Sequence, residues 1–528
     1  MKTVTSSKVI VISAVFLMAF GNAAFFSNVS EVYPPNLKNI AFLCSLSIGF
    51  SCAIVLLLSL FCYRHTTKPL LIAVFLISSF AAYFMDTYNI IIDDTMIQNI
   101  VSTDPAEISD LITVKLIVYV LFLGLMPSAW IYKVRIVYAD TRREALSRIK
   151  LFSATLGLAL AVILVFGRFY ASFFREHKPL RYFSNPSYYI YSTVKYLKRS
   201  IKKERLPLKP VGLDAKTPAT DTHRELIIFV VGETARADRF SLNGYKRETN
   251  PLLEKEAVIS FSNFWACGTS TALSVPCMFS IYTQSEYSDT KAQTTENVLD
   301  VLKHAGVNVL WLDNNSDSKG VAVRVRHENY KTPDKNPVCE VECLDEGMLA
   351  HLQTYVDDHP KGDIFIVLHQ MGSHGPAYYK RYPDAFEKFK PVCKTKQLED
   401  CSQAEIDNAY DNTILYTDYF LSKVIDWLRR NDAQFESALF YVSDHGESLG
   451  EHGVYLHGLP DFIAPDVQKQ VPAIMWFGST FDEIDMPSLI KKRHEKYSHD
   501  YIFHTILGFM EIETSVYDKA LDIVHGAQ

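Results

Sequence analysis

The stretch SALFYVSDHGESLGEHGVYLHG, residues 437–458, decides the fold prediction for the larger part of the chain. An apolar run that ends in Asp-His and is then interrupted by glycines is typical of a buried strand leading into a loop. In open α/β sheets, ligands bind beside the carboxyl ends of the strands. The carboxylate of Asp444 and the imidazole of His445 therefore predict a metal site, and the alternative interpretation is a polar surface loop.

The composition divides the 528 residues into two parts. The first 172 residues are largely apolar, whereas the rest has the mixed composition of a soluble protein. A chain of this length exceeds one ordinary domain. Its net charge of −6 and its pI near 6.3 give no indication of a nucleic-acid partner, and we expect none.

Five apolar segments are long enough to cross a bilayer, which takes about 20 residues. They lie near 9–28, 39–62, 69–88, 113–134 and 151–171. We interpret the first as a retained helix and not as a cleaved signal peptide, because it lacks a clear small-residue cleavage site and four further spans follow it.

The charges of the loops predict the orientation of these spans. Lys and Arg residues precede the first span and occupy the connections 63–68 and 133–150, whereas the loop 89–112 carries five acidic residues and neither Lys nor Arg. The positive-inside rule then places the N-terminus in the cytoplasm. An odd number of spans places residues 172–528 on the other side of the membrane.

The cysteines support the same location. Three lie in apolar segments, and the other six form three pairs that are close in sequence, with spacings of 10, 4 and 8 residues: Cys267 and Cys277, Cys339 and Cys343, Cys393 and Cys401. An even number of close cysteines indicates disulfide bonds and an oxidising compartment. A zinc cluster is the alternative, but the spacings include no Cys-x-x-Cys pair.

The segment 173–221 is predicted to connect the two parts. Its residues 174–210 mix Lys and Arg with Tyr and Phe, which favours a segment lying at the membrane surface, with aromatic rings at headgroup level. A plain solvated linker is the alternative. The expected domains are thus a five-helix transmembrane domain (1–172), this linker (173–221) and a catalytic domain (222–528).

Beyond residue 222, short apolar runs alternate with amphipathic stretches. The strand candidates are 226–231, 307–312, 364–369, 437–442 and 471–477, and helical patterns cover 294–304 and 409–430. Strands that alternate with helices predict an α/β/α sandwich with a mostly parallel sheet.

Each of the first four strands is followed by side chains that can carry chemistry. They are Glu233, Asn315, Lys319, His374, Asp444 and His445. Zinc accepts carboxylate oxygen and imidazole nitrogen, so Glu233, Asp444 and His445 with one hydroxyl would complete a tetrahedral set. The hydroxyl candidates are Thr269, Ser270 and Thr271, and His374 and His457 are candidates for a second metal or for the substrate.

A Ser or Thr hydroxyl at a metal site predicts a covalent mechanism. A metal beside a Ser or Thr lowers the pKa of its hydroxyl, and the resulting alkoxide can attack phosphorus. A phospho-enzyme divides one transfer into two steps, in which cationic groups offset the charge on the phosphoryl oxygens. Lys319 is the local candidate for that cation, and a solvated loop lysine is the alternative.

Five longer stretches resemble a known family. VVGETARADRFSLNGY, CGTSTALSVPCMFS, DNNSDSKG, HQMGSHGPAYYKRY and YVSDHGESLGEHGVYLHG are similar to motifs of the lipid A phosphoethanolamine transferases, which include the mobile colistin-resistance enzymes. The resemblance covers nearly the whole chain. It implies an alkaline-phosphatase-like (sulfatase-superfamily) domain on five transmembrane helices in the bacterial inner membrane, with the catalytic domain in the periplasm. It also implies transfer of phosphoethanolamine from phosphatidylethanolamine to a lipid A phosphate, lower negative surface charge and resistance to polymyxins such as colistin.

The resemblance also implies roles for single residues. It selects Thr271 as the nucleophile among the three hydroxyls, and it implies Glu233, Thr271, Asp444 and His445 as ligands of one tightly bound zinc. The residues implied for catalysis, for substrate binding or for a second zinc are His374, His457, Asn315 and Lys319, and, in the acidic loop, Asn99, Thr103 and Glu107. With the short loops, it predicts the disulfides Cys267–Cys277, Cys339–Cys343 and Cys393–Cys401. We expect a monomer.

Some features depart from the family, and other enzymes share parts of the pattern. The spacing of Cys339 and Cys343 is shorter than in some relatives, and His452 replaces an Asn that some relatives carry and is assigned no role. A sulfatase would need Cys or Ser in a C/S-x-P-x-R sequence, which SVPCM does not provide. A glycerolphosphate transferase of the lipoteichoic-acid-synthase type, or the same chemistry on a core sugar or a periplasmic glucan, are the alternative functions.

Overall fold

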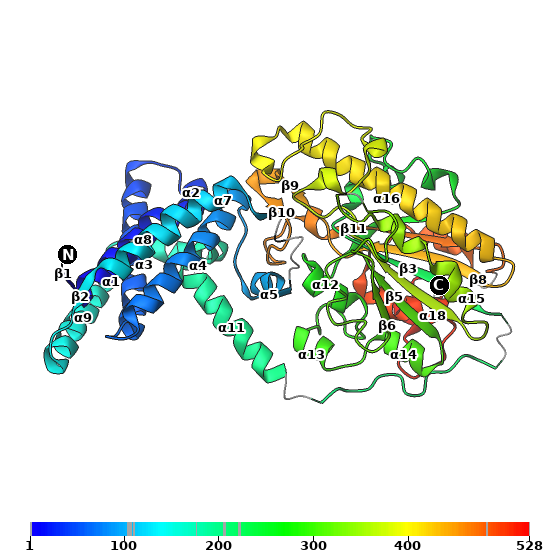
Figure 1. Ribbon diagram of the computed structural model, residues 1–528, viewed down its shortest axis with the longest axis horizontal. Coiled ribbons are helices and arrows are strands. Elements are labelled where there is room, and N and C mark those ends of the chain that lie inside the picture. Colours follow the sequence, from blue (N-terminus) through cyan, green and yellow to red (C-terminus); the bar gives the residue numbers. More distant parts are fainter. Residues whose placement is uncertain are drawn as a thin grey trace. The chain divides into compact units, whose positions relative to one another are not determined.

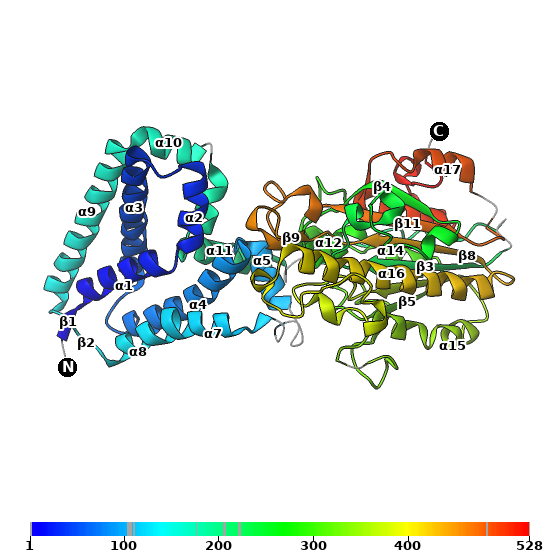
Figure 2. The same cartoon turned by 90° about the horizontal axis from the view of Figure 1, so that it is seen from above.

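The computed structural model describes residues 3–526 except 103–107, 109–110, 176, 204–206, 220–222, 340 and 482–483. Its internal contacts divide the chain into two units (Figures 1 and 2). The helical unit comprises Met1–Ile97 and Ile112–Leu197, and the α/β unit comprises Gln98–Leu111 and Lys198–Gln528. The predicted boundaries at 172 and 221 stay predictions.

The helical unit contains four helices that are long and apolar enough to cross a membrane, or five spans if the bent pair α1 and α2 counts as one. Its first helices are α1 (Ser6–Phe20), α2 (Ala23–Val32), α3 (Leu37–Phe61), α4 (Thr67–Tyr88) and α5 (Asp94–Ser102), and the last residues of α5 belong to the α/β unit. They are followed by α7 (Val114–Tyr119), η1 (Val120–Leu125), α8 (Met126–Lys133), α9 (Thr141–Val165), α10 (Gly167–Arg175), η2 (Lys178–Phe183) and α11 (Ser187–Lys203). Two short strands, β1 (Thr3–Thr5) and β2 (Arg135–Val137), also lie in this unit. The last apolar helix begins at Thr141, earlier than the predicted 151, because the charged residues before the apolar run also continue the helix.

Two asparagines hold the bend of the first span. Helices α1 and α2 meet at 57°, and Gly21 follows the last residue of α1 at this bend. The side chain of Asn185 donates to that carbonyl and to the carbonyl of Ser78, at 2.9 Å each. Asn22 and Asn185 also exchange two hydrogen bonds, of 2.8 and 2.9 Å. Backbone groups freed by a helix break need such partners inside a bilayer.

The α/β unit is built on one mixed sheet of eight strands. The strand order is β12 (Tyr497–Ser498), β4 (Ile259–Trp265), β11 (Gln470–Phe477), β8 (Glu436–Ser443), β3 (Glu225–Gly232), β7 (Ile364–His369), β5 (Asn308–Asp313) and β6 (Arg326–Asn329). Strand β11 runs antiparallel to both of its neighbours, and the other pairs are parallel.

Helices cover both faces of this sheet and make it the middle layer of a sandwich (Figure 2). One face packs on α12 (Thr271–Met278), α14 (Val298–His304) and α18 (Ile502–Phe509), and the other on α15 (Leu352–Asp357) and the long α16 (Gln403–Asn431). Two further α-helices of the described unit are α13 (Asp289–Gln293) and α17 (Met486–Lys492), and several one-turn 3-10 helices lie in the loops. Strand β3 is buried on both faces, as is typical of a central parallel strand.

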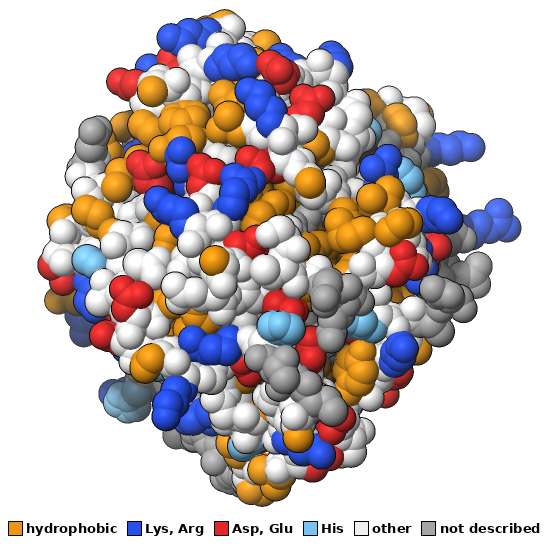
Figure 3. All heavy atoms as spheres, turned by 90° about the vertical axis from the view of Figure 1, so that its right-hand side faces the viewer, with side chains coloured by type: hydrophobic (Ala, Val, Ile, Leu, Met, Phe, Trp, Pro, Cys, Tyr) orange, Lys and Arg blue, Asp and Glu red, His pale blue; other side chains and the backbone are white. Residues whose placement is uncertain are grey.

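The five predicted strands lie within observed strands, apart from residue 307, and the predicted α/β/α class is confirmed. Strand β4 was not predicted, because Ser260, Ser262 and Asn263 interrupt its apolar pattern. The structure joins the cysteines in the three predicted pairs. Figure 3 shows basic, acidic and hydrophobic side chains interspersed over one face of the α/β unit, as expected for a surface in water.

A buried carboxylate fastens a loop to the longest helix. Asp418 of α16 is fully buried and accepts hydrogen bonds from the backbone N–H groups of Leu252 and Leu253, at 2.9 Å each. Burial raises the pKa of Asp418 to about 7, although these hydrogen bonds oppose the increase. The native state therefore binds a proton here between about pH 4 and 7, where the unfolded chain has lost it.

We expect the free energy of unfolding to fall as pH rises from 4.5 to 7.5, and Asp418→Asn to flatten that decrease. A shift of this size corresponds to on the order of 4 kcal/mol. Denaturation of the full chain in detergent at both pH values measures the change. Asp426→Asn, at a half-exposed position of the same helix, is the control and should keep the wild-type slope. Equal slopes for Asp418→Asn and wild type would contradict the expectation.

Candidate metal centre and active site

Two neighbouring strands bring the two site carboxylates together. Strands β3 and β8 are parallel and in register, with Gly232 opposite Ser443. Glu233 and Asp444 are the residues that directly follow the two strands, so both carboxylates lie close together at the carboxyl edge of the sheet. Thr271 reaches the same place as the first residue of α12.

The four predicted ligands meet in one buried cluster. The hydroxyl oxygen of Thr271 lies 3.1 and 3.3 Å from the two carboxylate oxygens of Glu233 and 3.3 Å from Nε2 of His445. Nε2 of His445 also lies 3.5 Å from Glu233 Oε1 and 3.4 Å from Asp444 Oδ2. All four residues are buried. The cluster is thus a set of oxygen and nitrogen atoms that surround one point.

The other two hydroxyls of the CGTST motif are differently engaged. Thr269 donates to the carbonyl of Leu459 at 2.6 Å. Ser270 has extended backbone geometry before the helix, and its buried hydroxyl has no hydrogen-bond partner in the described part of the chain. Among the three hydroxyls of the described chain, that of Thr271 contacts the carboxylate of Glu233, which agrees with the nucleophile that the resemblance implies.

Asp444 and His445 are adjacent in sequence and would face opposite sides of a regular strand. Strand β8 ends at Ser443, so both can turn toward the cluster. Oδ1 of Asp444 accepts hydrogen bonds from the backbone N–H groups of His445, at 2.7 Å, and Thr234, at 3.2 Å. The other carboxylate oxygen, Oδ2, faces the cluster. The next position, 446, requires glycine, because a Cβ there would lie 2.0 Å from the carbonyl oxygen of Val467.

The hydrogen bonds of His445 determine its tautomer. Nδ1 lies 2.9 Å from the carbonyl oxygen of Gly446, which can only accept, so Nδ1 carries the proton. Nε2 then presents a lone pair to the cluster. Burial, followed by the charge of His457, holds the pKa of His445 well below its usual value, so the imidazole stays neutral and able to bind a metal.

These donors fit a divalent cation. Two buried carboxylates within a few ångströms repel each other unless a positive charge lies between them. Oδ2 of Asp444 is buried and accepts no hydrogen bond from any described residue. Two carboxylates, one neutral imidazole and one hydroxyl are also donors that zinc accepts in tetrahedral sites.

Two further histidines lie on one side of the cluster. The ring of His457 is 4.4 Å from the ring of His445, and the ring of His374 is 5.4 Å from that of His457, both measured between centroids. Nδ1 of His457 lies 3.1 Å from the fully buried carboxylate of Glu447. The three rings thus lie in a row that begins at the candidate metal ligand His445.

The predicted polar residues after β5 divide into two environments. Asn315 donates to Glu233 Oε2 and to the carbonyl of Gln370, at 2.7 Å each, and so orients a candidate ligand. Lys319 donates to the carbonyl and the hydroxyl of Ser316, at 2.9 and 2.7 Å.

In the acidic loop, Asn99 is half-buried and its neighbour Gln98 donates a hydrogen bond to the carbonyl of Ala272 at 3.5 Å. Thr103 and Glu107 lie outside the described residues.

Glu447, His369 and Asp313 also lie near the cluster, although no role was predicted for them. His369, the last residue of β7, is fully buried, and its Nδ1 lies 3.1 Å from the carboxylate of Asp313 at the end of β5. Glu447 supports His457 as described above. The signal for all three was their position at or just after a strand end, but isolated acidic and histidine residues at such positions are too common to be selected from one sequence.

The sheet and the buried cluster define the class of the α/β unit. The sulfatase family model matches residues 225–512, so the predicted sulfatase-type fold is confirmed. A second family model, Phosphoethanolamine transferase EptA/EptB, matches residues 50–201.

Relatives that span nearly the whole chain narrow the class. Phosphatidylethanolamine transferase Mcr-2 of Escherichia coli is 41% identical over 520 residues, which cover 96% of this chain and 95% of the relative. Phosphoethanolamine transferase EptA of Escherichia coli K12 is 39% identical over 525 residues, covering 98% and 96%. The solved structure of lipooligosaccharide phosphoethanolamine transferase A from Neisseria meningitidis matches with a TM-score of 0.95 and 35% identity over 99% of both chains. The chain belongs to the phosphoethanolamine transferase family.

We expect Asp444→Ala and His445→Ala to lose bound zinc, because each removes one atom of the central cluster. His457→Ala should retain it, since Nδ1 of His457 is directed to Glu447 and not to the central carboxylates. Zinc per chain in the purified full-length variants is the measurement. His452→Ala, an exposed histidine of the same stretch, is the matched control. A loaded His445→Ala beside an empty His457→Ala would show that the central ligands are wrongly assigned.

Proposed function

We propose that this protein transfers phosphoethanolamine from phosphatidylethanolamine to a phosphate of lipid A, through a phosphorylated Thr271. The observation that carries the proposal is the Thr271 hydroxyl, which lies within hydrogen-bond distance of Glu233 and His445 at the first turn of α12. Relatives named as phosphatidylethanolamine and phosphoethanolamine transferases, which share about two fifths of their residues with this chain, support the donor and the transferred group.

The first half-reaction forms one bond and breaks one. The Thr271 oxygen attacks the phosphorus of phosphatidylethanolamine, and the bond from phosphorus to the diacylglycerol oxygen breaks. The Thr271 proton leaves toward the basic groups beside it, and the departing diacylglycerol oxygen takes up a proton. The rings of His457 and His374 follow that of His445 in a row, and we propose that these two histidines bind the donor phosphate and supply that proton.

The second half-reaction regenerates the enzyme. A phosphate oxygen of lipid A attacks the phosphorus of the phosphothreonine, and the bond to Thr271 breaks, which returns the hydroxyl. The acceptor phosphate monoester becomes a diphosphate that ends in ethanolamine. Its two phosphoryl groups carry about two negative charges and its ammonium one positive charge, a net charge of about −1 in place of roughly −1.5 to −2 for the monoester. The smaller net negative charge weakens the attraction of the lipid for cationic antibiotics such as polymyxins.

Zinc is the cofactor that we propose for the central cluster, held tightly by Glu233, Thr271, Asp444 and His445. When bound, zinc would lower the pKa of the threonine hydroxyl and offset charge on the phosphoryl oxygens. A second, weaker zinc would bind on the side of His374 and His457. Asn315 orients Glu233, and Lys319 and Asn99 are proposed to bind the donor with Thr103 and Glu107.

The proposed location follows from the loop charges and the cysteines. The chain would cross the bacterial inner membrane with its N-terminus in the cytoplasm and the α/β unit in the periplasm, where disulfides form. The active species would be a monomer, and its substrates would both be lipids. The proposed location is supported by the apolar helices of the helical unit and by the three cysteine pairs.

Mass spectrometry of lipid A from cells with and without this protein tests the function. We expect a mass increase of one phosphoethanolamine on lipid A. The same increase on a core sugar, as the name of a 27% identical Kdo(2)-lipid A phosphoethanolamine 7''-transferase would suggest, or on a periplasmic glucan, would overturn the acceptor. An increase of one glycerolphosphate would overturn the transferred group.

Thr271→Ala should abolish transfer while leaving the fold intact, because it removes one hydroxyl. Thr271→Ser, which keeps the hydroxyl, should retain part of the activity. Peptide mass mapping after incubation with phosphatidylethanolamine should find phosphoethanolamine on Thr271 of the wild type. A modified Ser270 would refute the assignment, and an active Thr271→Ala would refute the covalent mechanism.

The bridge Cys267–Cys277 encloses Thr271, whereas Cys393–Cys401 closes a loop of similar length elsewhere. Replacing both cysteines of either pair by Ser should cost about 2–5 kcal/mol of stability. Only loss of the first pair should also reduce transfer at least tenfold at a temperature where both variants are folded, because it frees the nucleophile loop. Thermal midpoints and initial rates of the two variants provide the comparison. Equal rates would contradict a positioning effect of the first bridge.

A further inference from the structure

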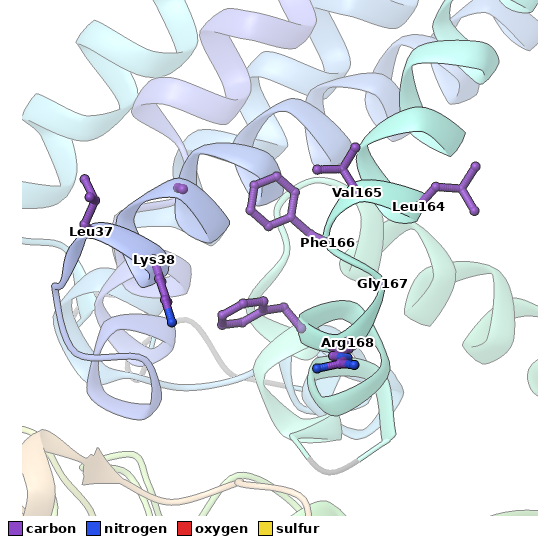
Figure 4. Close-up of a pocket in the computed structure, with 9 residues that line it drawn as sticks. Leu37, Lys38, Leu164, Val165, Phe166, Gly167 and Arg168 are labelled. Carbon is purple, nitrogen blue, oxygen red and sulfur yellow. The ribbon is translucent and has the colours of Figure 1, made fainter.

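The helical unit contains a pocket of about 670 Å³ that is separate from the residues proposed for transfer. It lies where the beginning of α3 meets the junction of α9 and α10 (Figure 4). Its lining comes from two segments, 37–41 and 164–169. Phe169 is held in the wall of this pocket, since its ring stacks on that of Phe42 with centroids 4.8 Å apart.

The rim of the pocket is apolar and faces outward. Leu37 is 87% exposed, Leu164 is 81% exposed and Val165 is 76% exposed. Each lies at the end of a helix that is long and apolar enough to cross a membrane. Apolar side chains with this exposure on a membrane-crossing helix contact acyl chains. The rim is therefore suited to the hydrocarbon part of a lipid.

The same pocket contains two cations and no carboxylate. Lys38 and Arg168 line it together with the ring of Phe166 (Figure 4), and none of the lining residues is acidic. Within the described part of the chain, neither Lys38 nor Arg168 has a carboxylate within 4.0 Å. Other cations of the unit are paired, such as Arg148 with Glu144 at 3.2 Å and Lys195 with Asp94 at 2.8 Å. The two positive charges in the pocket thus remain available to an anion.

The charge of the site selects among lipids. A phosphate monoester carries roughly −1.5 to −2 at pH 7, which matches two cations. A phosphate diester carries only about one negative charge, and the head group of phosphatidylethanolamine would bring its own ammonium near Lys38 and Arg168. With α1 and α2 counted as one span, the start of α3 and the end of α9 lie on the same side of the membrane, which the proposed orientation makes the periplasmic side.

We propose that this pocket binds the acceptor lipid, with a phosphate monoester of lipid A between Lys38 and Arg168 and its acyl chains against the apolar rim. The inference rests on the proposed function, which supplies the acceptor. It assigns a binding role to residues of the helical unit that lie outside the candidate metal centre. Charge-assisted contacts from Lys and Arg to phosphate are the strong class of hydrogen bonds, and their loss should be measurable.

Two kinds of variant test the site. Lys38→Gln combined with Arg168→Gln removes both charges. Gly167→Leu fills the pocket, because a Cβ at 167 meets no atom within 4 Å. The matched controls lie on α9 outside the pocket: Lys150→Gln for charge, and Gly157→Leu for bulk, since a Cβ at 157 also meets nothing within 4 Å.

Binding is measured on the purified full chain in detergent, by native mass spectrometry with bisphosphorylated lipid A as the probe. Wild type and both controls should retain lipid A, and the double variant and Gly167→Leu should lose at least tenfold in affinity. In the transfer assay the same two variants should raise the KM for lipid A at least tenfold, with formation of phosphorylated Thr271 from phosphatidylethanolamine unchanged.

The possible failures are distinguishable. Equal retention of lipid A by wild type and the double variant would overturn the proposal that this pocket binds the acceptor. Displacement of lipid A by an equal concentration of phosphatidylglycerol would overturn it too, because it would indicate a general site for anionic phospholipid. A wild-type chain that retains lipid A through Lys38 and Arg168 but does not modify it would instead overturn the proposed function and leave the binding site established.

Discussion

The in-register pairing of β3 with β8 is the constraint on which the site depends. It carries Glu233 and Asp444 out of the sheet together, so the fold buries two negative charges side by side. Burying like charges is unfavourable by several kcal/mol unless a cation and hydrogen bonds compensate. The neighbouring residues provide the hydrogen bonds: Asn315 to Glu233, and the backbone of Thr234 and His445 to Asp444. A bound cation would complete the compensation, which couples metal binding to the stability of the α/β unit.

The same arrangement explains why each group near the cluster has one orientation. The Gly446 carbonyl fixes the proton of His445 on Nδ1, so that Nε2 is the atom that faces Thr271. Asp444 uses one oxygen for the backbone and keeps the other for the cluster. The nucleophile is also the first residue of a helix, where backbone N–H groups remain available to an incoming phosphate. Preorganisation of this kind is the main source of rate enhancement in phosphoryl transfer.

The central features were predictable from sequence because they are local. Apolar runs that end in Glu233, Asp444 and His445 predicted both the strands and the residues at their ends. The direction of β11 was not predictable, since a run of apolar residues carries no information about strand polarity. The choice of Thr271 over Thr269 and Ser270 needed the family resemblance, because it depends on two features of the fold. Helix α12 begins at Thr271, and the hydroxyl of Thr269 is engaged in a hydrogen bond to the carbonyl of Leu459. The contact of Glu447 with His457 arises where the loop folds back on itself, and no spacing rule specifies it.

The bend of the first span has a consequence for how the chain is made. Among the described residues, the carbonyl of Gly21 obtains its hydrogen-bond partner from Asn185, a residue 164 positions later in the chain. At synthesis rates of roughly 5–20 residues per second, on the order of 10 s or more pass between the two. During this interval the first span has its neighbouring residues but not the side chain that satisfies its bend. Final packing of the N-terminal helix must therefore wait for the segment that leads into the α/β unit, which follows the last of the candidate spans.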